Sequence, residues 1–386
     1  MVRKSASRVR VAGRIALAAV LGLGALASVG AGPASGRPGA ESGGCRPPTG
    51  YATVDIGALG TGYNTGTDLN DAGLVVGRSE TADGMHAFAW RRGRLQDITP
   101  PGSTDATVVG VNERGQVAFS AYDPAAGETR TYLWRNGRTT TVGSGVAIDL
   151  NERGEVLFTG GLWRRGTVQP IVAPDGSDYT LIPQHLGDGG HVVGGVLPLA
   201  VPGGGHPTPS TGFVWHEGVL TIAVPSSGAF RQAVDVDRSG RVLFDAFGSP
   251  AALWDDGVTI DLGTLGGTTT YGADISERGA VAGSSSTASG EQHAFLWRDG
   301  RMTDLHPVAG AWSYAIEANR HGHVTGVVED AMGRRSVVWA CGHMVELGIE
   351  SPYGQYPIGI NDRGQVLSAA ITVDGNRVFL STPTRR

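Results

Sequence analysis

The chain has 386 residues, of which 62 are glycine and 20 are proline; 40% of the residues are hydrophobic, 17% are charged and the net charge is −5. The hydrophobic share is high enough to bury a core, so an intrinsically disordered chain is excluded, and the lack of a strict Gly-X-Y period excludes collagen. Each interior glycine costs a helix about 1 kcal/mol relative to alanine, which disfavours a helical protein. The composition therefore predicts an all-β chain with many tight turns.

The N-terminal segment has the layout of a secretory signal peptide. A basic start, from Arg3 to Arg14, is followed by an apolar run, Ile15 to Val29, and then by small residues. About 15 apolar residues are too few for the roughly 20 that span a bilayer. We therefore expect residues 1–31 to be a signal peptide cleaved near Ala31 or Ala34, residues 32–50 to be a Gly/Pro-rich linker, and residues 51–386 to form one domain.

Cleavage would remove five positive charges and no negative one, which leaves a net charge of about −10 and no lysine. Such an acidic chain lacks the basic surface that nucleic-acid binding requires. We therefore expect a secreted protein with no nucleic-acid partner. We also expect the mature chain to be a monomer without a membrane span.

A turn of the type Asn-x-x-Gly recurs at intervals of about 42 residues. Most copies are followed by a short apolar strand. The heads of the eight copies, one of which is degenerate, are Asn70, Asn112, Asn151, Gly187, Asp237, Ser276, Asn319 and Asn361.

A second recurring turn, Trp-x-x-Gly, lies downstream in seven units. We interpret its tryptophans as spacers between neighbouring units rather than as sugar-stacking residues, because they occur once per unit and always before a glycine turn. They are Trp90, Trp134, Trp163, Trp215, Trp254, Trp297 and Trp339.

The two turns divide each unit into four short antiparallel strands, which is typical of a β-propeller blade. We expect both turns to be three-residue hairpin loops, built on a type I turn and ended by a left-handed glycine. Residues 51–386 accommodate eight such units, so the prediction is an eight-bladed propeller. Seven blades or an open β-solenoid are the alternatives, because the third unit is short and the fourth is degenerate.

The ends of the repeat predict how the ring closes. The last unit lacks its fourth strand, while residues 52–57 form an additional strand in front of the first unit. The N-terminal strand is therefore expected to complete the last blade and remove the exposed sheet edges. This closure would bring Cys45 close to Cys341, and the only two cysteines of an exported chain predict one disulfide bond.

The most regular copies contain the tripeptide His-Ala-Phe, at His86–Phe88 and at His293–Phe295. Together with the turns, this tripeptide resembles the extracellular HAF-repeat proteins over about 330 residues. Other units depart from the tripeptide. The resemblance supports a secreted repeat protein and implies no particular activity.

Metal sites and cofactors are not predicted. The segment Asp235–Gly240 is similar to the start of a calcium loop, but most copies of this turn carry arginine or histidine where a third ligand would stand. His321, His323 and His343 lie close in the repeat, yet His321 occupies an exposed turn position. We interpret these residues as parts of hairpins.

The loops between blades and between the second and third strands vary in length, and they share one face, called here the loop face. The uniform turns share the other, called the turn face. Variable loops on a rigid scaffold are where binding residues concentrate. Tyr63, Trp312 and Tyr353 are the predicted ligand-binding residues, whereas a structural role is expected for Tyr271, Tyr314 and Tyr356, which each lie five residues before a turn head.

No catalytic motif is present in the sequence. The leading hypothesis is therefore a non-enzymatic propeller that binds an extracellular or cell-surface glycan or protein through the loop face. The alternatives are a secreted propeller enzyme, a glycan hydrolase or lyase, and a purely structural surface protein.

Overall fold

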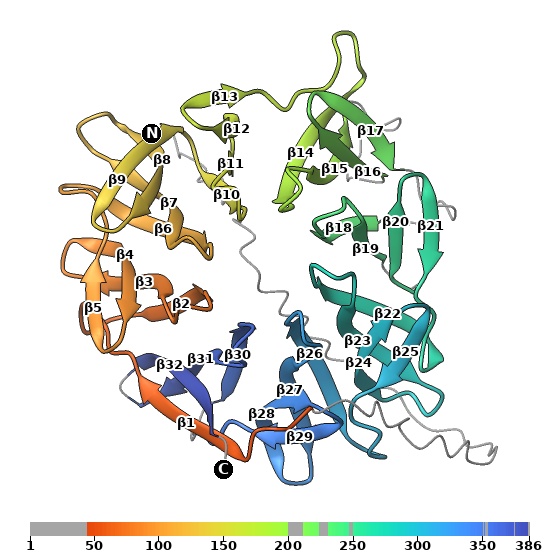
Figure 1. Cartoon of the computed structure of the whole chain (residues 1–386). Coiled ribbons are helices and arrows are strands. Elements are labelled where there is room, and N and C mark those ends of the chain that lie inside the picture. The colour runs from red at the N-terminus through yellow and green to blue at the C-terminus, as the bar shows by residue number, and fades with distance from the viewer. Residues whose placement is uncertain are drawn as a thin grey trace, which may run out of the picture.

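The computed structural model describes residues 45–199, 211–223, 231–246, 250–349, 351, 354–373 and 375–384. The predicted signal peptide and most of the linker lie outside these residues. The described chain forms eight antiparallel sheets of four strands each, arranged around a central axis as a β-propeller (Figure 1). The prediction of eight blades is confirmed.

The inner strand of each blade lies nearest the axis, and the other strands follow outward (Figure 1). Blades 1 to 4 contain, from the inside outward, β2 (Asn64–Leu69), β3 (Val75–Thr81), β4 (Gly84–Arg91) and β5 (Arg94–Asp97); β6 (Thr104–Val111), β7 (Gln116–Asp123), β8 (Glu128–Arg135) and β9 (Arg138–Ser144); β10 (Ala147–Leu150), β11 (Val156–Phe158), β12 (Gly161–Arg164) and β13 (Thr167–Gln169); β14 (Tyr179–Leu186), β15 (Val192–Pro198), β16 (Thr211–His216) and β17 (Val219–Ala223).

Blades 5 to 8 follow in the same order. They contain β18 (Arg231–Val236), β19 (Val242–Ala246), β20 (Ala252–Asp255) and β21 (Val258–Asp261); β22 (Gly266–Ile275), β23 (Val281–Thr287), β24 (Gln292–Arg298) and β25 (Arg301–Asp304); β26 (Trp312–Ala318), β27 (Val324–Asp330), β28 (Gly333–Ala340) and β29 (His343–Glu346); β30 (Gln355–Ile360), β31 (Val366–Thr372), β32 (Gly375–Thr384) and β1 (Gly50–Asp55).

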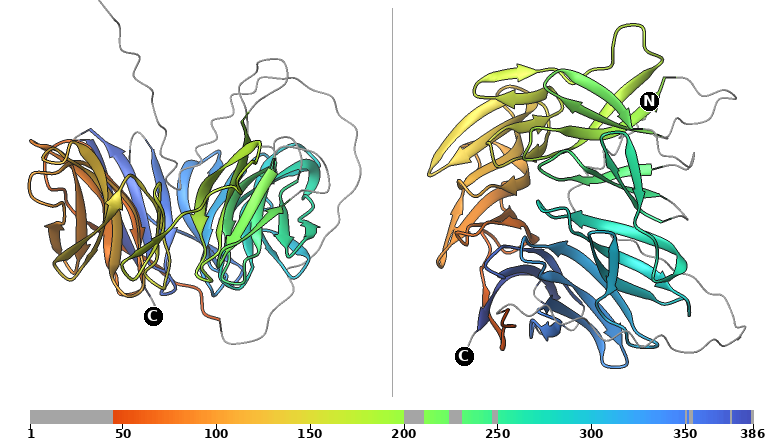
Figure 2. Two further views of the ribbon diagram at one scale, coloured as in Figure 1. Left: turned by 90° about the horizontal axis from the view of Figure 1, so that it is seen from above. Right: turned by 45° about the vertical axis from the view of Figure 1, so that its right-hand side comes forward.

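The ring closes as the sequence predicts. The N-terminal strand β1 pairs with β32 in antiparallel register, from Gly50 opposite Thr384 to Asp55 opposite Phe379, and so becomes the outer strand of blade 8. Seen from the side, the blades stand next to one another in a ring that is one blade deep (Figure 2). No helix among the described residues has the length and apolar character needed to cross a membrane.

The core is divided among the blade interfaces. Eight hydrophobic clusters of described residues each join two neighbouring blades, including blades 8 and 1. Six of the seven repeat tryptophans are at least 93% buried in these clusters, and Trp163 is half-buried. Trp254, for example, packs with Val193 and Val214 of the preceding blade. Their position is that of spacers between blades.

The two recurring turns differ from each other, which corrects one prediction. In the Asn-x-x-Gly turns only the glycine has a positive φ, as in Gly73, and Gly73 N donates to the carbonyl of Asn70, as expected for a type I turn that ends in a left-handed glycine. In the Trp-x-x-Gly turns Arg91 pairs directly with Arg94, so only two residues remain in the loop.

Both of these loop residues have positive φ, 52° for Arg92 and 80° for Gly93, which defines a type I′ turn. The same pair of angles recurs in all seven copies, with Cys341 at φ 55° in blade 7. The predicted three-residue loop is therefore wrong for this turn. The type I′ turn is favoured because its twist matches that of the flanking strands.

Each of the eight inner strands contains a β-bulge at the same place, for instance between Gly66 and Asp68 in β2. The bulge brings a carbonyl of the inner strand close to the second strand, so that an added Cβ at Gly77 would collide with the carbonyl of Thr65. This close approach explains the glycine that several units keep in the second strand.

Candidate functional site

The loop face carries aromatic side chains on adjacent blades, of which Tyr271 and Tyr356 are half-buried and the others exposed. Tyr271, Tyr314 and Tyr356 occupy the same register position on the inner strands of blades 6, 7 and 8, because each lies immediately before the residue that precedes the bulge. In blade 6 an added Cβ at Gly272 would contact Leu243 of blade 5, so Tyr271, one residue earlier, points to the opposite side, toward blade 7. The three tyrosines thus follow the inner rim of the ring.

Two predicted ligand-binding residues extend this row. Trp312 lies two residues before Tyr314 on β26, so both side chains project from the same side of the strand, and the buried Ser313 lies between them. Tyr63 precedes β2 in blade 1. Tyr63 and Trp312 are each 42% exposed and Tyr314 is 37% exposed. We call Tyr63, Tyr271, Trp312, Tyr314 and Tyr356 the aromatic arc.

The backbone that carries the arc is well anchored. Tyr63 N donates to Oε2 of Glu80 at 2.9 Å, and Trp312 and Tyr314 pair with Glu329 and Val327 on β27. Burial, with the carboxylate of Glu329 adding to it, raises the pKa of Tyr314, whose hydroxyl therefore stays protonated at neutral pH. Burial together with the neighbouring Tyr63 raises the pKa of Tyr356. The arc therefore offers neutral rings and hydroxyl donors on a rigid support.

The third predicted ligand-binding residue, Tyr353, lies outside the described residues. The other two, Tyr63 and Trp312, lie on the loop face and are exposed. Tyr63 belongs to blade 1 and Trp312 to blade 7, and blade 8 between them contributes Tyr356. A structural role was expected for Tyr314, but its side chain is exposed. Exposed and buried residues alternate at the start of β26, and Tyr314 lies at one of the exposed positions.

A small apolar pocket lies on the same face between blades 3 and 4. It has a volume of about 280 Å³, and its walls include Phe158, Ile171, Leu181, Ile182 and Pro183. The pocket forms because blade 3 is short: β11 and β13 have three residues each, so this blade covers less of its neighbour. Sequence reasoning noted the short unit but not the pocket.

On the turn face, in contrast, asparagine side chains form hydrogen bonds between neighbouring blades at five of the eight interfaces. Nδ2 of Asn70 donates to the carbonyl of Asn112, 2.9 Å away, and Nδ2 of Asn112 donates to the carbonyl of Asn151 at 3.1 Å. Each of these asparagines uses its side-chain oxygen within its own turn, as Asn112 Oδ1 does by accepting from Gln116 N. The turn heads therefore bind their own loop and the next blade at once.

A carboxylate follows six of the eight turn heads, and arginine follows the other two. We call the six acidic residues the acidic ring; they are Asp71, Glu113, Glu152, Asp188, Glu277 and Asp362. The N–H of Asp71 donates to Glu113, that of Glu113 to Glu152, and that of Glu152 to Asp188, at distances of 2.8 to 2.9 Å. Burial, with Asp188 and Glu113 adding to it, raises the pKa of Glu152 to about 7. A hydrogen bond to Asp188, followed by burial, raises the pKa of Glu277 to about 7.

The histidine of the His-Ala-Phe tripeptide links the third and fourth strands of its blade. Nδ1 of His293 lies 2.8 Å from Oδ2 of Asp304, and Nδ1 of His86 lies 2.7 Å from Oδ2 of Asp97. Blades 7 and 8 place arginine at the same register position. The equivalent pairs there are Arg335 with Glu346 at 2.8 Å and Arg377 with Asp55 at 3.0 Å. We call these four pairs the strand clamps.

The carboxylates of the calcium-like segment are bonded to protein donors. Oδ1 of Asp237 accepts from the backbone of Ser239 and of Arg241, and its Oδ2 accepts from Nε of Arg241 at 2.7 Å. Oδ1 of Asp235 accepts from Val236 N. This segment is a hairpin turn held by an arginine, in agreement with the interpretation from sequence.

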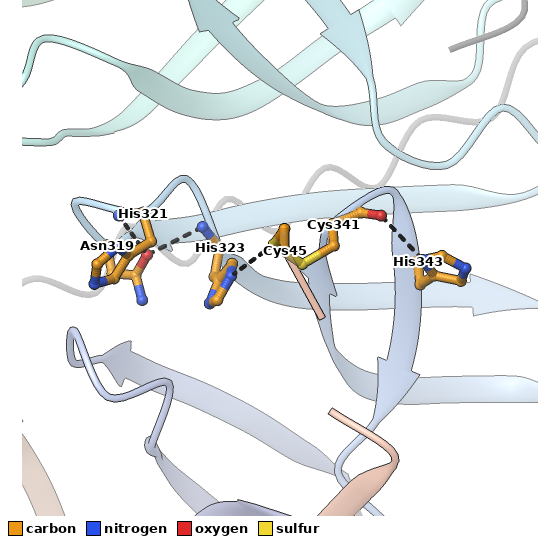
Figure 3. The surroundings of a disulfide bond; sticks show 6 residues. All are labelled: Cys45, Asn319, His321, His323, Cys341 and His343. Carbon is orange, nitrogen blue, oxygen red and sulfur yellow. Dashed lines mark hydrogen bonds between the residues drawn. A yellow bond between two sulfur atoms is a disulfide. The ribbon is translucent and has the colours of Figure 1, made fainter. Parts of the chain in front are cut away.

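The predicted disulfide bond is confirmed: Cys45, just before β1, is bonded to Cys341 in the β28–β29 turn, with 5.8 Å between their Cα atoms. His321 and His323 lie beside this bridge and His343 on its other side (Figure 3). Nδ1 of His343 is 2.9 Å from the carbonyl oxygen of Cys341. The bridge joins the seam between blades 7 and 8.

No protein-family model matches the chain, and no curated protein matches it. Among solved structures, it is similar to the β-propeller domain of the Trilobed protease from Pyrococcus furiosus, with 13% identity, a TM-score of 0.48, and coverage of 74% of this chain and 98% of that one. An acylaminoacyl peptidase gives 11% identity, a TM-score of 0.43, and coverage of 80% and 57%.

A third similar structure is YCF48 bound to D1 peptide, with 9% identity, a TM-score of 0.43, and coverage of 87% of this chain and 96% of that one. These similarities concern the propeller architecture and do not extend to a ligand or an activity.

Proposed function

We propose that the protein is exported and acts as a non-enzymatic β-propeller that binds an extracellular ligand through its loop face. The observation that supports this proposal best is the aromatic arc, which presents aromatic rings from four consecutive blades at one rim. Exposed aromatic rings on a rigid backbone bind with little loss of conformational freedom. A glycan chain suits this arc, because the apolar faces of its sugars can stack on the aromatic rings and its hydroxyl groups can bond the tyrosine hydroxyls. A protein ligand is the second choice.

Export is supported by the signal-like N-terminus and by the disulfide bond, which persists in oxidising compartments. The absence of a membrane-spanning helix from the described residues is compatible with it. We further propose membership of the HAF-repeat proteins and a monomeric mature chain. The position of His-Ala-Phe in the third strand, with Phe88 and Phe295 fully buried, is consistent with a repeat maintained for blade packing.

An enzymatic function is the alternative, and one observation favours it. Carboxyl groups with a raised pKa often serve as general acids, and Glu152 and Glu277 have such pKa values beside Asp188. However, these groups lie on the turn face, whereas the aromatic arc lies on the loop face. A glycan held by the arc would therefore not reach them, so binding is the better proposal; a purely structural surface protein is the third possibility.

The test combines a glycan array with an assay for release of reducing sugar or unsaturated products from polysaccharides. We expect retention of a glycan class without turnover, and weaker retention for Trp312→Ala combined with Tyr314→Ala. Met344→Ala, on the outer strand of the same blade, is the control and should bind normally. Turnover of any polymer would replace the proposal by the enzymatic one, and the absence of binding and turnover would favour a structural role.

A further inference from the structure

The disulfide bond stands beside a histidine, and the three side chains come from three separate segments of the chain. Cys45 precedes β1, Cys341 lies in the β28–β29 turn, and His323 precedes β27 (Figure 3). Nε2 of His323 lies 4.0 Å from Sγ of Cys45, and the two sulfurs and a ring nitrogen of His323 all lie within 4.8 Å of one another. Two cysteines and one histidine form a common zinc ligand set.

The turn that precedes His323 is held in place by its head residue, Asn319. His323 N donates to Oδ1 of Asn319 at 3.0 Å, and Nδ2 of Asn319 donates to the carbonyl of Asn361 in blade 8 at 2.9 Å. Asn319 is 95% buried. Because the backbone of His323 is positioned by a buried side chain and not by the disulfide, the histidine keeps its place when the bridge opens.

We propose that reduction of the Cys45–Cys341 disulfide creates a Zn²⁺ site made of Cys45 Sγ, Cys341 Sγ and His323 Nε2. A dithiol supplies the two electrons: it cleaves the S–S bond, is itself oxidised to a disulfide, and leaves two thiols on the protein. Binding of Zn²⁺ then displaces one proton from each thiol to solvent. A water molecule takes the fourth tetrahedral position.

The geometry requires only a small rearrangement. Zn–S bonds of about 2.3 Å and a Zn–N bond of about 2.0–2.1 Å in a tetrahedral site place the two sulfurs about 3.8 Å apart. The sulfurs must therefore separate after reduction. Cys45 is exposed and lies before the first strand, so its segment has room to move. The seam between blades 7 and 8 is then joined by a covalent bond when oxidised and by a metal ion when reduced.

The proposed ligand set differs from the group of three histidines, His321, His323 and His343, that lie close together in the repeat. His343 lies on the far side of Cys341 from His323, and its Nδ1 is directed at the carbonyl of Cys341 (Figure 3). His343 is therefore a matched control: it is a histidine close to the bridge that the proposed site does not use.

The experiment uses the full chain, reduced with a dithiol, freed of it under anaerobic conditions, and titrated with Co²⁺ and then Zn²⁺. We expect one equivalent of Co²⁺ to bind with a thiolate-to-cobalt charge-transfer band that Zn²⁺ abolishes. Zn²⁺ should slow alkylation of both cysteines at least tenfold. The oxidised chain should show no such band. His323→Ala should weaken binding at least tenfold, and His343→Ala should not.

Near-ultraviolet circular dichroism of the reduced chain reports whether the propeller is intact. An intact reduced chain that binds no Co²⁺ would overturn the proposal, as would equal binding by the oxidised chain or by His323→Ala. A reduced chain that loses its tertiary signal would overturn it too, because the two thiols would no longer be held beside His323.

Discussion

Nδ2 of Asn361 donates to the backbone carbonyl of Asn70, 3.0 Å away, although the two residues are 291 positions apart in the chain. The bond joins blade 8 to blade 1 and repeats the bond that Asn70 makes to Asn112. Three turn heads cannot provide it: Gly187 lacks a side chain, and Asp237 and Ser276 lack an amide group. The interfaces that follow blades 4, 5 and 6 are therefore without this bond.

Replacing Asn361 by alanine should lower the free energy of unfolding by about 1–3 kcal/mol, because buried backbone groups of two blades lose a partner. Asn361→Asp keeps the oxygen that accepts from Gln365 N but loses the amide that donates to Asn70 in the next blade and to the side chain of Gln365. Urea denaturation should rank the wild type above both variants. An Asn361→Asp variant as stable as the wild type would show that the inter-blade bond contributes nothing.

The strand clamps predict which substitutions the tripeptide histidine tolerates. His293→Ala should lower the free energy of unfolding by about 1–2 kcal/mol, since Oδ2 of Asp304 loses its partner while Oδ1 keeps its bond from His306 N. His293→Arg should retain most of the stability, because Arg335 occupies the equivalent position in blade 7 and forms an ion pair with Glu346. Thermal denaturation of both variants provides the comparison. Equal losses for alanine and arginine would argue that His293 acts through packing alone.

Much of the fold could be predicted from the sequence, because the Asn-x-x-Gly turn or a variant of it recurs in every blade and the Trp-x-x-Gly turn in seven, and both carry glycine at positions of positive φ. The closing strand and the disulfide followed from where the repeat starts and stops. The two-residue turn at Arg92 was not predicted, since arginine is not a residue that signals positive φ. The bonds from the asparagine heads to the next blade were not predicted, because such a contact depends on how the blades are stacked.

The site was predicted less completely than the fold. Tyr63 and Trp312 could be selected as residues of variable loops. The places of Tyr314, which is exposed, and of Tyr356, which is half-buried, could not be predicted, because they depend on which side of each inner strand faces the rim. The pocket near Phe158 was not predicted either, because it depends on how much of blade 4 the short blade 3 covers. No local sequence motif encodes that coverage.

The acidic ring predicts a stability that falls as pH rises through the acidic range. Glu152 and Glu277 ionise near pH 4.5 in the unfolded chain and near pH 7 in the folded one. Between these values the folded chain holds more protons, so the free energy of unfolding decreases from about pH 4.5 to 7, and the contribution is absent above pH 7. Denaturation across this range at low salt measures the slope, since salt screens these partly exposed groups.

Glu152→Gln should flatten this slope and keep an oxygen that accepts from Glu113 N. Glu291→Gln is the control: hydrogen bonds, the strongest from Ser289, lower the pKa of Glu291 to about 2, so it is ionised throughout the range and its removal should leave the slope unchanged. A slope that survives Glu152→Gln and Glu277→Gln together would assign the pH dependence to other groups.

The repeat tryptophans should differ in their contribution to stability. Trp297, 6% exposed, packs with Leu243 and Leu253 of blade 5, so Trp297→Ala should cost about 3–5 kcal/mol. Trp163 belongs to the short blade and is only half-buried, so Trp163→Ala should cost clearly less. Denaturation of the two variants tests this order. A reversed order would mean that the short blade carries more of the ring's stability than its burial implies.

The aromatic arc makes a prediction that distinguishes its rings from its hydroxyls. If a glycan stacks on Tyr314, Tyr314→Phe should retain most of the affinity and Tyr314→Ala should lose about 1 kcal/mol, roughly a fivefold weakening. If the hydroxyl is the main contact, both variants should lose affinity alike. The hydroxyl lies near Glu329 and Arg334, which also interact with it electrostatically. Calorimetry with the glycan that the array identifies measures these affinities and decides between stacking and hydrogen bonding. If Tyr314→Ala binds the glycan as tightly as the wild type does, Tyr314 is not part of the site.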